Sequence, residues 1–285
     1  PPPPPHPPPP PPPPPTSPTR RSSDLNQPLR AAGEFERIAT TEKDPSLQRE
    51  AAWTTASLYQ QAGREQQSIK AYTRFVEQFP RPVEQAMEGR HQLVMLYEKT
   101  NDPVKQRYWQ KQMVDADRAA GNERSDRTRS LAAHARLAVV APDYMAYKNT
   151  QLKEPLKDNL ARKKKFMKAA IKGYNEAAAY TVSDVTTQAT FHIGELYTDF
   201  GQALMSSERP RNLSGEELEQ YEILLEEQAY PFEEKAIEVH ETNAQRVTGG
   251  IYDTWVRKSM ARLAELIPAR YAKEERGENF VAILQ

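Results

Sequence analysis

The chain has 285 residues, of which 39 are basic and 39 are acidic, so its formal net charge is zero. Such a balance creates no overall field that would attract nucleic acid, and we expect no nucleic-acid partner. Cysteine is absent, which excludes disulfides, thiolate metal sites and cysteine nucleophiles. No apolar run approaches the roughly 18 residues of a membrane-spanning helix, so we expect no transmembrane segment in this fragment.

The first 25 residues form a low-complexity tail. Residues 1–15 are all proline except His6, a composition typical of a polyproline II segment or an SH3-type ligand. The following stretch, residues 18–25, reads instead like the translation of a sequencing adaptor. We interpret residues 1–25 as a disordered tail produced by a sequencing artefact and exclude it from the fold.

Residues 26–140 are predicted to form helix pairs, beginning with half of a pair. Ala31, Phe35 and Ile38 share one helix face, and the helix ends before Asp44-Pro45. Its apolar face would have no preceding helix to cover it. We therefore expect the natural gene product to extend upstream of this sequence.

A complete pair follows between residues 52 and 80. Small residues allow two helices to cross closely, aromatic residues fill the remaining space, a glycine ends the first helix and a proline stops the second. The residues with these roles are Ala52, Ala56, Tyr59, Gly63, Tyr72, Phe75 and Pro80.

These spacings resemble the signature of the tetratricopeptide repeat, a helix-turn-helix unit of about 34 residues. The resemblance implies an all-α fold in which antiparallel helix pairs stack into a right-handed solenoid. Tyr97, with a turn at Asn101 and a helix start at Asp102-Pro103, indicates a second unit. A helix capped by Asp126 should then run to about Val140.

The C-terminal half is expected to be less regular. Residues 141–158 contain Pro142 and Pro155 and are predicted to be an irregular connection, either a domain junction or an insertion in a repeat. Residues 159–273 are predicted to be a degenerate repeat-like helical region, and residues 274–285 to be frayed. Signals within this region are a basic helix over 160–180, a capping box at Ser214, a kink or division at Pro231 and a last helix over 251–267.

A third unit is indicated within that region by Gly194, Tyr197 and a turn glycine at Gly201. Lys164, Lys165, Lys168 and Lys172 line one face of the helix that precedes it. We interpret this face as solvent-exposed, with docking of an acidic partner or of lipid headgroups as the alternative.

No catalytic, cofactor or metal motif is present, and the histidines are scattered. The resemblance instead implies a partner-binding groove lined by the first helix of each unit. The implied groove residues are Trp53, Thr54, Ser57, His91, Gln92, Met95, Phe191 and His192, with Glu195 beside them. Because these positions are mostly neutral, a carboxylate clamp is not expected. The alternative for Trp53 and Phe191 is packing against the preceding repeat.

The sequence therefore predicts a non-enzymatic scaffold that binds a protein peptide or helix. The irregular C-terminal half of the sequence also resembles large bacterial repeat proteins of TonB-ExbB-ExbD-type or gliding systems. This resemblance implies an envelope complex and a periplasmic or membrane-associated location. Two alternatives stay open. One is a regulatory helical region of an enzyme whose catalytic domain lies upstream, and the other is a self-assembling structural spacer.

Overall fold

The computed structural model describes residues 18–210 and 213–272, and all regular secondary structure within them is helical. The prediction of an all-α fold is thus confirmed for this part of the chain. The α-helices are α1 (Pro18–Thr41), α2 (Pro45–Gln61), α3 (Glu65–Gln78), α4 (Val83–Lys99), α5 (Pro103–Ala119), α6 (Asp126–Val139), α7 (Ala141–Asn149), α8 (Leu156–Ala178), α9 (Ser183–Met205), α10 (Gly215–Ala244), α11 (Thr254–Leu266) and α12 (Pro268–Tyr271). Short 3₁₀ helices follow α5 (Gly121–Glu123) and α10 (Gln245–Gly249).

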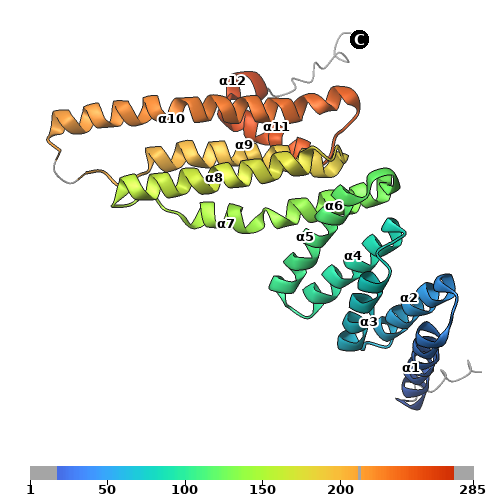
Figure 1. Cartoon of the computed structure of the whole chain (residues 1–285). Coiled ribbons are helices and arrows are strands. Elements are labelled where there is room, and N and C mark those ends of the chain that lie inside the picture. Colours follow the sequence, from blue (N-terminus) through green and yellow to red (C-terminus); the bar gives the residue numbers. More distant parts are fainter. Residues whose placement is uncertain (1–17, 211–212, 273–285) are drawn as a thin grey trace, which may run out of the picture.

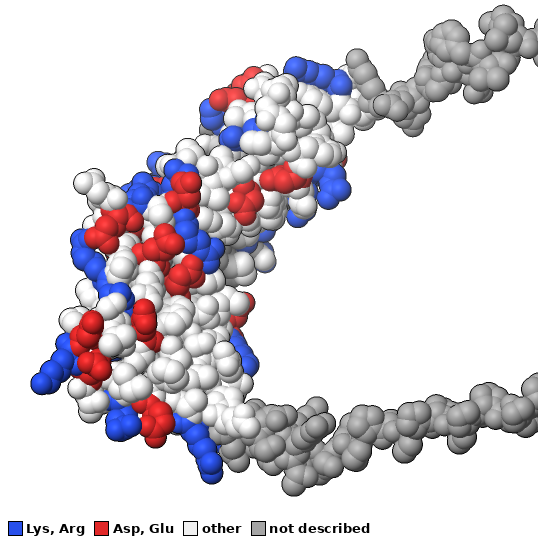
Figure 2. Space-filling view, turned by 90° about the vertical axis from the view of Figure 1, so that its right-hand side faces the viewer, with Lys and Arg blue, Asp and Glu red and all other residues white. Residues whose placement is uncertain are grey.

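Each helix packs against its neighbours along the chain, which gives an elongated molecule. Figure 1 shows α1 to α6 stepping away from a second group, in which α7, α8, α9 and α10 lie side by side. The core is divided accordingly. One hydrophobic cluster is centred on Phe75, Met87 and Leu93, and another on Tyr147, Leu196 and Phe200. Figure 2 shows that the outline is curved and hollowed along one side.

The pair α2–α3 follows the sequence signals closely. The Asp44 carboxylate accepts a hydrogen bond from Ser46 N at 2.7 Å and starts α2, with Pro45 in the first turn. Gly63 has φ of 67°, a left-handed conformation that glycine adopts without steric cost, and it separates the two helices. The helices approach closely enough for Ser68 Oγ to donate to the carbonyl of Ala56 at 3.0 Å. The small residues thus permit the close crossing.

The next turns also form where expected, with one change of cap. Asn101 has φ of 55°, and Asp102 caps α5 by accepting from Lys105 N at 3.0 Å. The cap of α6 is Ser125 and not Asp126. Ser125 Oγ accepts from Thr128 N, and Thr128 Oγ1 accepts from Ser125 N, which makes a reciprocal capping box. Asp126 is therefore the first helical residue.

The connection predicted over residues 141–158 is largely helical. Residues 141–149 form α7, and only residues 150–155 are irregular. Pro142 lies in the first turn of α7, where a missing N–H removes no helical hydrogen bond. Tyr147 is fully buried and donates to the carbonyl of Leu196 at 3.0 Å, so tertiary contacts hold α7 in place.

Two expected breaks in the C-terminal helices are absent. Gly201 was expected to form a turn, but α9 continues through it to Met205. Pro231 was expected to kink or divide its helix, yet α10 is continuous from Gly215 to Ala244. Pro231 is exposed, so water can satisfy the carbonyl that the proline leaves without a donor. By contrast, the capping box at Ser214 forms as predicted. Gly250, at φ of 82°, makes the turn before α11.

Two further predictions concern the ends of the chain. Helix α1 begins at Pro18, so its backbone includes residues that we assigned to the artefactual tail. Residues 1–17, which include the proline tract, lie outside the described residues. The same is true of residues 274–285, which are predicted to be frayed. Within the described residues, no helix combines the length and apolar character required to cross a membrane.

Candidate functional site

The predicted groove residues on α2 differ in accessibility. Trp53 lies edge-on against Tyr72 and Phe75 of α3, with ring centroids 5.4 Å and 5.3 Å apart. Such pairs add roughly 0.5–1.5 kcal/mol beyond the burial of the rings. Thr54 and Ser57 are half-buried on the same helix. Trp53 therefore takes part in the packing between α2 and α3, within its own helix pair.

The groove residues on α4 include one open apolar side chain. Gln92 Oε1 accepts from Gln60 Nε2 of α2 at 3.1 Å. His91 is half-buried, and its burial lowers its pKa below the ordinary value for histidine. Met95 is 47% exposed, a large fraction for an apolar side chain. Of the eight predicted groove residues, Met95 is the one classed as exposed in this structure.

The groove residues on α9 lie in an aromatic cluster. His192 stacks on Tyr174 of α8 with centroids 5.2 Å apart and 17° between the planes. It also contacts Tyr144 of α7 and Trp255 of α11, and Phe191 contacts Trp255 at 5.4 Å. Burial lowers the pKa of His192 below the ordinary value for histidine, which favours the neutral ring. These contacts come from three other helices and fix both side chains.

Polar contacts also join a set of non-consecutive helices. We call α2, α4, α6, α9 and α11 the bridged helices. The contacts are Gln60 to Gln92, Glu88 to Arg127, His134 to Asp184, and Thr187 to Asp253. Each contact links one bridged helix to the next, Asp253 being the N-cap of α11. They link the bridged helices in series along the molecule.

A buried polar network closes this series between α9, α10 and α11. Arg262 donates two hydrogen bonds to Glu195, Nε to Oε1 and Nη2 to Oε2, both at 2.7 Å. Burial alone would raise the pKa of Glu195, but hydrogen bonds from His240 and Arg262 outweigh it and lower the pKa to about 2. Glu195 is thus ionised and paired, so it is not an open groove residue.

The same network contains a serine, a histidine and a carboxylate in sequence. Ser259 Oγ lies 3.3 Å from His240 Nδ1, and His240 Nε2 lies 3.5 Å from Glu195 Oε1. This order matches that of a nucleophile, base and orienting acid. Ser259 and His240 are both completely buried, and Ser259 Oγ also accepts from Asn243 Nδ2 at 2.9 Å. A substrate has no access to this hydroxyl, so the group acts as a packed hydrogen-bond network.

Two residues of α11, Trp255 and Arg262, also belong to this site. The sequence does not indicate them, because no local spacing relates them to α9. No cluster of three or more His, Cys, Asp or Glu residues in the described part of the chain could hold a metal ion. Comparison with known proteins adds no assignment, since no protein-family profile matches the chain and no curated protein is significantly similar to it. The fold therefore defines the chain only as an all-α protein.

Proposed function

We propose that the chain is a non-enzymatic scaffold whose bridged helices present an elongated surface to a protein partner. The observation that carries the proposal is the series of contacts that joins α2, α4, α6, α9 and α11. A surface made of several helices linked in series suits an extended peptide or a helix, because the binding site is ordered before the partner arrives. Met95 supplies an exposed apolar anchor on α4.

The same observation supports the finer proposal of a tetratricopeptide-like, right-handed solenoid. In such a solenoid the first helices of successive pairs line one face, and α2, α4 and α9 carry the repeat-like residues Tyr59, Tyr97 and Tyr197. The resemblance of the sequence to large bacterial repeat proteins extends the proposal to a bacterial envelope assembly. The chain would then be periplasmic or membrane-associated. Cell fractionation with an antibody against the chain tests that location, and a purely cytosolic signal would contradict it.

The groove proposal predicts that Met95→Glu abolishes capture of a specific partner. A carboxylate at this position would have to be desolvated in an apolar contact, which costs more than the loss of the thioether alone. The measurement is affinity capture from an extract of the source organism, followed by mass spectrometry. Val104→Glu is the matched control, since Val104 is 74% exposed on α5, which is not a bridged helix. Equal capture by both variants would contradict the groove assignment.

A second candidate function, self-assembly into a spacer, is favoured by the charges of α8 and α10. Helix α8 carries seven basic residues and two acidic ones, whereas α10 carries ten acidic residues and one lysine. All of these lysines and the arginine on α8 are exposed except Lys163. Figure 1 shows α10 extending past the end of α9. Exposed Ile223 and Leu224 lie in the first half of α10, and exposed Tyr230 lies at its middle. The acidic and apolar face of one copy thus complements the basic face of another.

Self-assembly through these faces predicts association that is lost in high salt. Contacts between exposed charges weaken when the Debye length falls from about 10 Å at ~0.1 M salt to about 3 Å at ~1 M. Multi-angle light scattering at the two salt concentrations measures the mass. Lys165→Glu with Lys168→Glu should remain monomeric in low salt, while the control pair Lys70→Glu with Lys111→Glu should associate like the wild type. A monomer under all conditions would exclude the spacer.

A further inference from the structure

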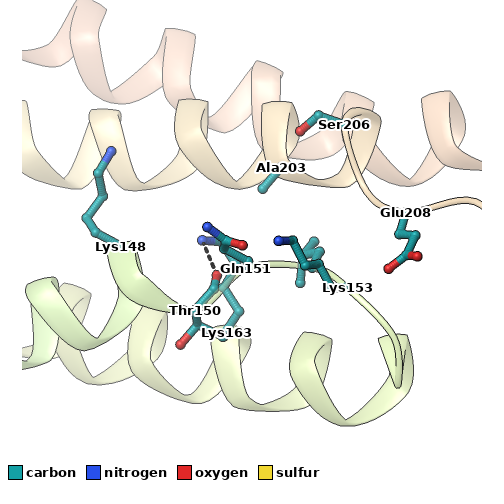
Figure 3. A pocket seen from close by; sticks show the side chains of 9 residues that line it. Lys148, Thr150, Gln151, Lys153, Lys163, Ala203, Ser206 and Glu208 are labelled. Atoms are coloured by element: carbon teal, nitrogen blue, oxygen red, sulfur yellow. Dashed lines mark hydrogen bonds between the residues drawn. The ribbon is translucent and has the colours of Figure 1, made fainter.

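A cavity of about 530 Å³ lies where the end of α7 and the loop over residues 150–155 meet α8 and the last turns of α9. Figure 3 shows this cavity, with Ala203 and Ser206 on its α9 side and Thr150, Gln151 and Lys163 opposite them. No residue of the predicted groove lines it. It is therefore a separate place on the molecule.

Lys163 is the unusual residue of this cavity, because it is only 5% exposed. Its ammonium group donates to the carbonyls of Tyr147 at 3.2 Å and Thr150 at 3.0 Å, and lies 4.1 Å from the centre of the Tyr147 ring. These carbonyls lie at the C-terminal end of α7, and their partial negative charge favours a cation. They are dipoles, however, and neither is a carboxylate. The buried charge has no bonded counter-ion within the described residues.

An ammonium group has three donors, and the described residues provide acceptors for two of those on Lys163. The remaining donor lies at the wall of the cavity, which has room for several non-hydrogen atoms of a ligand. Burial lowers the pKa of Lys163, in agreement with a charge that is incompletely compensated. An anion in the cavity would supply both the missing acceptor and the missing charge.

The other charged groups place this anion at one end of the cavity. Lys153 is exposed, and Figure 3 shows its amino group and that of Lys163 pointing into the same space beside Gln151. Lys148 is neutralised, since its Nζ lies 2.5 Å from Asp199 Oδ2. Glu208 lies at the other end, where it accepts from Glu154 N at 3.1 Å. Repulsion from Glu208 leaves the space between Lys153 and Lys163 for the anionic group.

We propose that this cavity binds a small anion, with its phosphate or carboxylate oxygens between the amino groups of Lys153 and Lys163. Gln151 supplies an amide donor at the same end, while Ser206 Oγ donates to the carbonyl of Gln202 and so accepts from a ligand. The site accommodates either a phosphorylated or a carboxylated small molecule, since both offer negatively charged oxygen acceptors and lysine recognises them as a point charge. Binding here goes beyond the scaffold function and does not depend on it.

Calorimetric titration of the full chain with inorganic phosphate and, separately, with citrate tests the proposal. We expect saturable binding of at least one anion, and an accompanying rise in Tm because the ligand binds the folded state. Phosphate-only binding identifies the phosphorylated class and citrate-only binding the carboxylated class. Binding of neither, at constant ionic strength, would overturn the proposal.

Three lysine variants test whether the anion binds at this position. Lys153→Gln should weaken binding about tenfold or more, since it removes one charge-assisted hydrogen bond from an exposed position. Lys157→Gln, also exposed and at the start of α8, should bind like the wild type. Lys163→Met should abolish binding, but it also alters the end of α7, so the decision rests on Lys153. Unchanged affinity in Lys153→Gln would contradict the site.

Discussion

Replacement of Arg262 by methionine is expected to lower the free energy of unfolding by about 3–5 kcal/mol. Arg262 donates two hydrogen bonds of 2.7 Å to Glu195, whose side chain is only 15% exposed. Without the guanidinium, a largely buried carboxylate would lose both of these hydrogen bonds. Urea denaturation at pH 7, followed by circular dichroism, measures the change.

Arg257→Met is the matched control for this variant. Arg257 lies on the same helix, is exposed, and has no salt bridge to another described residue. We expect its effect to stay within about 0.5 kcal/mol. Equal stabilities of the two variants would contradict the role given to the pair between α9 and α11.

Acid should weaken the same contact in the wild type. The pKa of Glu195 is about 2 in the folded chain, below the ordinary value of about 4.3 that applies to the unfolded chain. The stabilisation is therefore complete above about pH 4.3 and is lost as the pH falls towards 2, by about 3 kcal/mol in all. The difference in stability between wild type and Arg262→Met should shrink over that range. A constant difference would mean that Glu195 keeps its ordinary pKa.

Gly194→Val should destabilise the chain by about 3 kcal/mol, the upper part of the range for overpacking. A Cβ atom at residue 194 would lie 2.5 Å from His240 Nε2 and 2.6 Å from His240 Cε1. His240 is completely buried between α9 and α11, so its ring has no free space into which to move. Thermal unfolding measured by calorimetry gives the change in Tm.

Gly201→Ala is the control within the same helix and is expected to stabilise the chain by up to about 1 kcal/mol. Its Cβ would be 3.6 Å from the carbonyl oxygen of Ala229, an ordinary contact. Residue 201 is helical, so alanine costs less backbone entropy than glycine. A gain in stability from Gly194→Val, or a large loss of stability from Gly201→Ala, would contradict the close crossing of α9 and α10.

These two glycines show which structural roles can be predicted from local sequence and which cannot. Gly194 was correctly predicted as a position of close approach, because a small residue beside an aromatic one is typical of crossed helices. Gly201 was wrongly predicted as a turn, because glycine in a helix and glycine after a helix look alike in sequence. Contacts of α9 with α10 and α11 maintain the helix to Met205. Turns with their own backbone requirements, such as Gly63 and Asn101, were predicted correctly.

In the candidate groove, too, local sequence does not predict which residues are covered by other helices. The resemblance to the repeat family implied that Trp53, Phe191 and His192 line one groove, but their exposure depends on which side chains the other helices place against them. Tyr72 and Phe75 cover one side of Trp53, and Trp255 lies against Phe191 and His192. Residues 191 and 255 are distant in sequence, so no periodicity within α9 could have indicated the contact. Met95 stays open because no described helix packs over it.

Site-specific photo-crosslinking at residue 95 tests the central claim most directly. A benzophenone side chain introduced at Met95, in the full chain expressed in its source organism, reports which molecules touch this face of α4. The scaffold proposal predicts a discrete adduct with a partner protein at residue 95 and none at the control position Val104 on α5. The absence of any adduct at residue 95, or the same adducts at both positions, would contradict it.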